Sequence, residues 1–282
     1  MELTVPGAGM FRALTVSLAL ELEVLTEICP MATTGRALFK VRSSLDGLVY
    51  ALKVFDLTKN DQGLIRREMV ALNRQLSMPE KFPRYRCFFE RDGLGYLLLD
   101  WMEGTPLSEA VRSGVAKGAD EVRLRVSYLK ELCATLSLVH KSGCCHRDIK
   151  PQNILLRNPK SPREGVVLID FGLAAMKRSA VEGTHGFAAP EQQTQTGVLI
   201  DRRTDIFGVG AVAWWLLSGV EFSFFSDDDG GWSGLAAGVL RSYAPDVSER
   251  LERTIIKALS FRPADRHGSA QELGVRFAEA CS

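Results

Sequence analysis

The stretch from His146 to Asn153 constrains this 282-residue chain more than any other, because it places several chemically active side chains at fixed spacing beside apolar segments. Within it a lysine stands two residues after Asp148 and an asparagine five residues after. The apolar run 154–156 follows, and a second run, 166–169, leads directly into Asp170-Phe171-Gly172. Two short apolar runs around a polar loop predict a pair of buried strands. Both polar segments therefore lie at strand ends.

These residue types suit the transfer of a phosphoryl group. The carboxylate of Asp148 can orient a hydroxyl group and accept its proton, and Lys150 can meet the charge of the phosphoryl group. Asn153 and Asp170 can together hold a divalent metal ion, here Mg²⁺. In this reaction the protein mainly positions groups and neutralises charge.

The segments H-R-D-I-K-P-Q-N and D-F-G resemble the catalytic and metal-binding loops of protein kinases. The resemblance runs from Glu23 to the C-terminus and implies an α+β, bilobal fold with a small β-rich first lobe and a larger helical second lobe. It divides the chain into an N-terminal extension at 1–22, a first lobe at 23–102 and a second lobe at 103–282, which form one kinase domain. Lys150 and Thr184 favour the Ser/Thr branch over the tyrosine branch, and I-K-P-Q-N is common in bacterial kinases of eukaryotic type.

The first lobe is predicted to contain strands and one helix. A strand is expected at 23–28, and two hairpins are expected, each closed by an Asp-Gly turn: 36–42 with 49–55, and 86–90 with 96–100. Apolar residues at helical spacing predict a helix over 64–76.

The resemblance also implies ATP-binding residues. Lys53 matches the strand lysine that contacts the α- and β-phosphates, and Glu68 matches its glutamate partner on the next helix. Four further positions are expected around the adenine: Ala51, Asp100, Met102 and Leu155.

In the second lobe, helices are predicted at 120–140 with Asp120 as N-cap, at 205–219 and at 251–259. The resemblance implies that Asp205 holds the catalytic loop from below and that Arg266 pairs with Glu191 of the A-P-E segment. It also implies that Thr184 contacts Asp148 or Lys150, and that His146 packs in the core and takes no part in proton transfer.

The loop that covers phosphate in such proteins departs from the glycine-rich pattern. Between Ile28 and Leu38 it has one glycine, Gly35, and a proline at Pro30, which has no N–H to offer. Side chains in this loop hinder close approach of the backbone to phosphate, so the sequence predicts weak ATP binding. Arg36 either turns inward and supplies phosphate charge or stays on the surface; both remain open.

The composition limits the classes of binding partner that the sequence favours. Charged residues make up 24% of the chain and cancel to a net +1, which favours neither nucleic acid nor an anionic membrane. The six cysteines have no ligand-like spacing and are expected to be reduced thiols in a cytoplasmic protein. The apolar run 11–20 is expected to form an extra strand or helix, since it is not followed by a signal-peptide cleavage site and is too short for a membrane span. Met1, Met10 and Met31 all remain candidate starts.

Three functions stay open at this stage. The first is an ATP- and Mg²⁺-dependent kinase acting on Ser or Thr of a protein substrate, with autophosphorylation at Ser179 as a hypothesis. The second is a pseudokinase that binds nucleotide as a scaffold, which the degenerate loop favours. The third is a small-molecule kinase, which the G-T-x-x-x-x-A-P-E segment from Gly183 to Glu191 disfavours. The acidic run 227–229 is expected to be a solvated loop.

Overall fold

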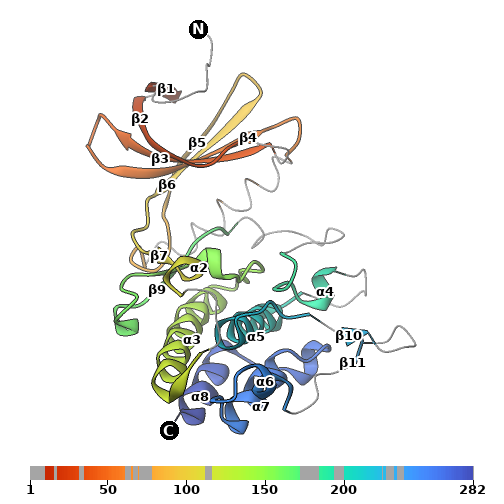
Figure 1. Ribbon diagram of the computed structural model, residues 1–282. Helices are drawn as coiled ribbons and strands as arrows, with labels where there is room; N and C mark the ends of the chain where they lie inside the picture. The colour runs from red at the N-terminus through yellow and green to blue at the C-terminus, as the bar shows by residue number, and fades with distance from the viewer. Residues whose placement is uncertain are drawn as a thin grey trace. The chain divides into compact units, whose positions relative to one another are not determined.

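The computed structural model describes residues 10–15, 18–31, 35–60, 65, 69, 78–111, 116–171, 184–193, 200–223, 225–226, 232–233 and 238–281. The chain divides into two units, traced in Figure 1: the first comprises Met1–Pro79 and Pro83–Met102, and the second comprises Glu80–Phe82 and Glu103–Ser282. Several predictions lie outside the described residues: Glu68 with most of the helix at 64–76, Gly172, Ser179 and the acidic run 227–229.

The first unit is built on a six-stranded antiparallel sheet with the order β1-β2-β3-β4-β6-β5. Its strands are β1 Met10–Thr15, β2 Leu18–Cys29, β3 Arg36–Ser43, β4 Val49–Asp56, β5 Tyr85–Arg91 and β6 Leu94–Asp100. Of the apolar run 11–20, for which a strand and a helix were both open, residues 11–15 lie in β1 and residues 18–20 begin β2. The strand predicted at 23–28 is therefore part of a longer one.

The two predicted hairpins form, and their turns follow from local chemistry. In the β3–β4 turn, Gly47 adopts φ +72° and the Asp46 carboxylate accepts a hydrogen bond from the Leu48 N–H at 2.9 Å. In the β5–β6 turn, Asp92 and Gly93 have φ of +51° and +75°. Two successive positive φ values are typical of a two-residue type I′ turn, whose twist matches that of the strands.

The core of the first unit lies on one face of this sheet. Buried and more exposed residues alternate along β3 and through most of β4, as period-two geometry requires. The inward side chains include Phe39, Val41, Leu52 and Val54. Burial continues without alternation through the middle of β6, so that strand is covered on both faces.

The second unit is mainly helical, which together with the first confirms the predicted α+β class. A small sheet carries β7 Thr105–Pro106, β8 Ile154–Leu156 and β9 Val166–Leu168, and a short hairpin carries β10 Phe225–Ser226 and β11 Trp232–Ser233. The α-helices are α2 Leu107–Ala110, α3 Gly118–Lys141, α4 Pro190–Gln193, α5 Arg202–Ser218, α6 Val239–Tyr243, α7 Glu249–Ala258 and α8 Ala270–Ala280. Three short 3₁₀ turns are η1 Pro151–Asn153, η2 Pro162–Glu164 and η3 Pro263–Asp265. None of the helices in the described part of the chain is long and apolar enough to cross a membrane.

Helix α3 begins earlier than the sequence predicted. Its N-cap is Lys117, and Asp120 lies in the first turn, so the assignment of Asp120 as N-cap is wrong. The reason is a competing acceptor: the Glu121 carboxylate accepts a hydrogen bond from the Lys117 N–H at 2.8 Å. Asp120 still faces the positive end of the helix dipole and forms an exposed ion pair with Arg123.

Helix α5 is the centre of the second unit, and α3 and α7 pack against it (Figure 1). Nearly all its residues are buried. The helix begins three residues before Asp205, because Asp201 accepts a hydrogen bond from the Arg203 N–H at 2.7 Å and so acts as N-cap. Gly219 ends it in the left-handed conformation, with φ +78°.

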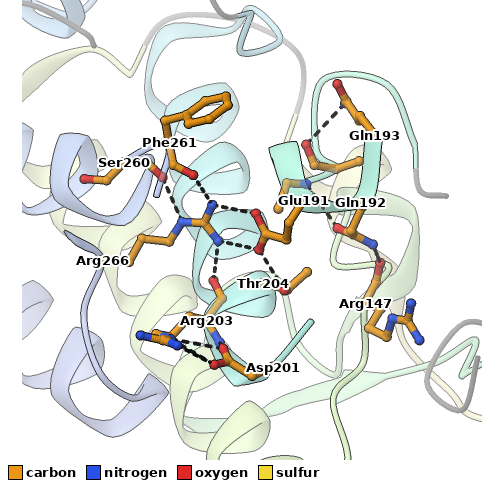
Figure 2. A network of polar contacts seen from close by, with 12 residues as sticks. Arg147, Glu191, Gln192, Gln193, Asp201, Arg203, Thr204, Ser260, Phe261 and Arg266 are labelled. Carbon is orange, nitrogen blue, oxygen red and sulfur yellow. Dashed lines mark hydrogen bonds and ion pairs between the residues drawn. The ribbon is translucent and has the colours of Figure 1, made fainter. Parts of the chain in front are cut away.

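A buried ion pair fixes the start of α4 to the far end of the chain, as the sequence predicted. The Arg266 guanidinium donates to both carboxylate oxygens of Glu191, at 2.7 and 2.8 Å, and their side chains are 0% and 2% exposed. Thr204 donates to the same carboxylate at 2.8 Å. Arg266 also donates to the carbonyl groups of Arg203, Ser260 and Phe261 (Figure 2). Every charge in the pair is therefore matched by hydrogen bonds, which a buried ion pair needs.

We predict that Arg266→Ala lowers the free energy of unfolding by about 3–5 kcal/mol, because it leaves the Glu191 carboxylate buried without its cation. Urea unfolding followed by circular dichroism measures this. Arg253→Ala is the matched control: it breaks an exposed pair with Glu249 and should cost less than about 1 kcal/mol. Equal costs for the two variants would contradict the prediction.

Candidate functional site

The loop from His146 to Asn153 is held by one buried carboxylate on α5. Asp205 is 1% exposed, and its Oδ2 accepts hydrogen bonds from the His146 N–H and from His140 Nε2, both at 2.8 Å. Its Oδ1 accepts from the Arg147 N–H at 2.6 Å. The predicted role of Asp205 in holding this loop is therefore confirmed.

Three donors keep Asp205 ionised. Burial raises the pKa of the Asp205 carboxyl, but the hydrogen bond and charge of His140 and the Arg147 N–H outweigh burial, so its pKa lies below the ordinary value. The carboxylate in turn stabilises Arg147, whose φ of +69° is an uncommon backbone conformation for a residue with a side chain. The loop thus depends on a charge that is taken out of water and matched by donors.

Asp148 lies at the centre of a group of donors. Its Oδ2 contacts Lys150 Nζ at 2.7 Å and accepts from Asn153 Nδ2 at 2.9 Å. Its Oδ1 accepts from the Thr184 hydroxyl at 3.0 Å, and Lys150 Nζ donates to that same hydroxyl at 3.0 Å. Thr184 therefore contacts both Asp148 and Lys150, which confirms the predicted contact. The arrangement fixes the carboxylate in one rotamer beside an ammonium group.

Asn153 and Asp170 offer the oxygen atoms that a hard divalent cation prefers. Asn153 directs its Nδ2 at the side chain and the carbonyl of Asp148, at 2.9 Å each, so its Oδ1 points the other way. The Ile169 N–H donates to the Asn153 carbonyl at 3.1 Å, which ties the residue before Asp170 to Asn153. Asp170 itself has φ +65°. The described residues contain no group of three or more His, Cys, Asp or Glu side chains that could hold a metal ion.

His146 has a structural place in this site, as the sequence predicted. Its side chain is fully buried, its ring lies 4.7 Å from the ring of Phe171, and Phe171 packs edge-on against Phe82. His146 Nε2 donates to the Ile169 carbonyl at 3.0 Å, which leaves Nδ1 to accept from the Asp148 N–H at 3.3 Å. The two polar segments are therefore joined through the histidine ring.

Three predicted nucleotide residues of the first unit, Ala51, Lys53 and Asp100, lie on β4 and β6, and Met102 follows the end of β6. Lys53 pairs across the sheet with Leu38 and Leu97, and Ala51 pairs with Leu99. The Asp100 carboxylate forms ion pairs with Arg84 and Arg86, and Met102 is buried. In the second unit, Leu155 is buried on β8.

Asn60 holds the end of the atypical loop, and no pattern in the sequence marks it. Its Nδ2 donates to the Gly35 carbonyl at 3.0 Å, and its Oδ1 accepts from Arg36 Nε at 2.6 Å. Gly35 adopts φ +64°, and its carbonyl also accepts from the Asp56 N–H at 2.8 Å. Arg36 is exposed, so of the two alternatives the structure favours the one in which Arg36 stays on the surface.

A family model described as the protein kinase domain matches residues 33–276 of the chain. Among curated relatives, the serine/threonine-protein kinase Pkn1 of Myxococcus xanthus is 36% identical over 190 residues, which are 62% of this chain and 26% of that protein. The serine/threonine-protein kinase pkn3 of the same organism is 29% identical over 258 residues, 83% of this chain and 45% of that protein. The chain thus spans less than half the length of these relatives.

Among solved structures, the PknI kinase domain of Mycobacterium tuberculosis matches with a TM-score of 0.66 and 22% identity, and the match covers 95% of this chain and 99% of that one. This likeness confirms the predicted fold. The family match and the names of the relatives confirm the resemblance to bacterial kinases of eukaryotic type.

We predict that Asp205→Asn lowers the free energy of unfolding at neutral pH by about 1–3 kcal/mol, because the amide NH₂ group of asparagine would face buried N–H donors. Because the folded pKa of Asp205 is lowered, its contribution is complete above the unfolded value of 3.8 and is lost as the pH falls through the folded value. The difference in unfolding free energy between wild type and Asp205→Asn should therefore narrow in acid. Urea unfolding at several pH values measures it.

Asp201→Asn is the matched control on the same helix. Asparagine caps a helix about as well as aspartate, so this variant should stay within about 1 kcal/mol of wild type. A difference for Asp205→Asn that stays constant as the pH falls would contradict the assignment of the effect to its charge.

Proposed function

Because this chain belongs to the protein kinase family, we propose that it transfers the γ-phosphoryl group of ATP to a serine or threonine hydroxyl of a protein. The observation that carries the proposal is the set of contacts around Asp148, in which Lys150 and Thr184 bind the carboxylate and each other. The relatives named serine/threonine-protein kinases support the choice of acceptor.

Asp148 has the capacity to receive an acceptor hydroxyl. A carboxylate has about four lone-pair positions on its two oxygens. In the contacts above, Oδ2 takes Lys150 and Asn153, whereas Oδ1 takes Thr184 alone. One position on Oδ1 therefore serves the substrate hydroxyl, which it orients and whose proton it takes.

The reaction then balances as an in-line displacement. The substrate oxygen forms a bond to the γ-phosphorus, the bond from that phosphorus to the β–γ bridging oxygen breaks, ADP leaves, and the hydroxyl proton passes to Asp148. Lys150 lies 2.7 Å from the carboxylate and supplies positive charge near the transferring group. Asn153 and Asp170 would hold Mg²⁺, which when bound neutralises phosphate charge. Lys53, paired with Glu68, remains our candidate for the α- and β-phosphates.

The degenerate phosphate loop favours one competing function, a nucleotide-binding pseudokinase. The presence of four residues of the second unit argues against a pseudokinase: Asp148, Lys150 and the two candidate metal ligands, Asn153 and Asp170. A pseudokinase would bind ATP and transfer nothing. Ser179, our candidate for autophosphorylation, lies outside the described residues.

We predict that Asp148→Asn lowers kcat for phosphoryl transfer to casein or myelin basic protein by about 10²–10⁴-fold, because the amide cannot take the hydroxyl proton. Labelled ATP followed by phosphoamino-acid analysis measures the rate and should detect phosphoserine or phosphothreonine. Nucleotide binding by Asp148→Asn, followed by calorimetry, should match wild type, and chelation of Mg²⁺ should abolish transfer in both. Wild-type rates in Asp148→Asn would refute this assignment.

We predict a KM for ATP toward the upper part of the range of about 1 μM–1 mM, because the loop lacks most of the usual glycines. Arg36→Ala should change this KM less than about twofold. The Arg36 guanidinium is bonded to Asn60, so its removal should take away no contact with ATP. An ATP titration of both proteins is the measurement. A large rise in KM for Arg36→Ala would instead support an inward arginine.

A further inference from the structure

Gln192 follows the buried Glu191 and is not among the residues to which we assign a part in phosphoryl transfer. It lies in α4 and is 4% exposed. A buried side-chain amide is costly unless both its ends are bonded. Here both ends are bonded, and one of the partners belongs to the loop that carries Asp148 (Figure 2).

The two partners fix the orientation of the amide. Gln192 Oε1 accepts from the Ala189 N–H at 3.0 Å, and Nε2 donates to the Arg147 carbonyl at 2.8 Å. The first partner is only a donor and the second only an acceptor, so an oxygen must face Ala189 and a nitrogen must face Arg147. No other ordinary side chain of this size offers an acceptor and a donor at these places.

The bond to Arg147 acts on the peptide group that precedes the catalytic aspartate. The carbonyl of Arg147 and the N–H of Asp148 belong to the same planar peptide group. Gln192 holds the carbonyl end, and His146 Nδ1 holds the N–H end at 3.3 Å. The peptide group before Arg147 is held too, since the Arg147 N–H donates to Asp205 at 2.6 Å.

We infer that Gln192 is a positioning residue for Asp148. The inference rests on the proposed kinase activity of this site. Without the bond from Gln192, the Arg147–Asp148 peptide group can rotate, and Arg147 is already in the left-handed conformation with φ +69°. Rotation of that peptide group shifts the Asp148 carboxylate relative to Lys150 and Thr184.

Gln192 also couples Asp148 to the segment that reaches it from the other side. Thr184 contacts the Asp148 carboxylate, and Gln192, eight residues later, contacts the backbone before it. Glu191 fixes this segment to Arg266 at 2.7 Å. The aspartate is therefore in position only when the segment from Thr184 to Gln193 is in position as well.

Gln192→Glu and Gln192→Met test the inference. The first keeps the shape but places an oxygen against the Arg147 carbonyl, and the second keeps the length but makes no hydrogen bond. Gln193→Met is the matched control: the neighbouring amide is less buried and makes a 3.3 Å bond to the Ala188 carbonyl, away from the catalytic loop.

In steady-state assays with casein, both Gln192 variants should lower kcat by about 10–100-fold, the effect of a small misplacement of a catalytic group. The KM for ATP should stay within about twofold of wild type, since nucleotide contacts are unchanged. The melting temperature of Gln192→Met should fall by less than about 5 °C, so in that variant the loss of rate exceeds any loss of folded protein. Gln193→Met should match wild type.

Hydrogen–deuterium exchange gives a readout that does not depend on activity. The peptide covering residues 145–150 should exchange faster in Gln192→Met than in wild type or Gln193→Met. Unchanged exchange, or unchanged kcat in both Gln192 variants, overturns the inference, and so does a loss of rate that only follows the loss of folded protein. A wild type that transfers no phosphate refutes the proposed function, while the exchange result still decides whether Gln192 holds the loop.

Discussion

The second unit depends on the buried carboxylate of Asp205. Burying an ionised group in the protein interior costs several kcal/mol unless donors replace its water. Asp205 receives two backbone N–H groups of one loop and one imidazole nitrogen of α3. A loop conformation that removed these donors would leave the buried carboxylate unsatisfied and would therefore be higher in free energy. The charge therefore selects one loop conformation out of the many that a polar eight-residue segment could adopt.

The same reasoning explains why the site is assembled from segments far apart in the chain. Asp148 takes its donors from its own loop and from Thr184, while the loop backbone is bonded to α5 and α4. Backbone groups at the ends of short elements have no partner within those elements, so side chains from other segments complete them. Each hydrogen bond of this kind to the loop restricts the conformations that Asp148 can adopt.

The sequence predicted the residues whose partners are set by charge or by a fixed motif. The resemblance to protein kinases implied the ion pair of Glu191 with Arg266 and the loop contact of Asp205, and the structure has both. Hairpin turns could be predicted because Asp-Gly itself prefers positive φ.

What the sequence could not predict depends on neutral amides and on competing local bonds. Gln192 and Asn60 bind backbone groups, and no charge or periodicity marks such residues before the fold brings the backbone to them. The start of α3 was misplaced because Asp120 and Glu121 are both good acceptors, and only the structure decides which of them takes the Lys117 N–H. The run 11–20 was ambiguous because a short apolar segment fits a strand and a helix equally well.

The choice of polar over apolar anchors in this unit has a physical reason. Apolar side chains of the same volume often stabilise a core as well as a buried ion pair does, or better. They are non-directional, however, and dispersion contacts change little when a backbone carbonyl rotates. A hydrogen bond weakens steeply once its angle departs from linearity, so Asp205 and Gln192 hold peptide groups in orientation as well as in place. If Asp148 receives a substrate hydroxyl, as we propose, the orientation of its carboxylate is the property that packing alone does not supply.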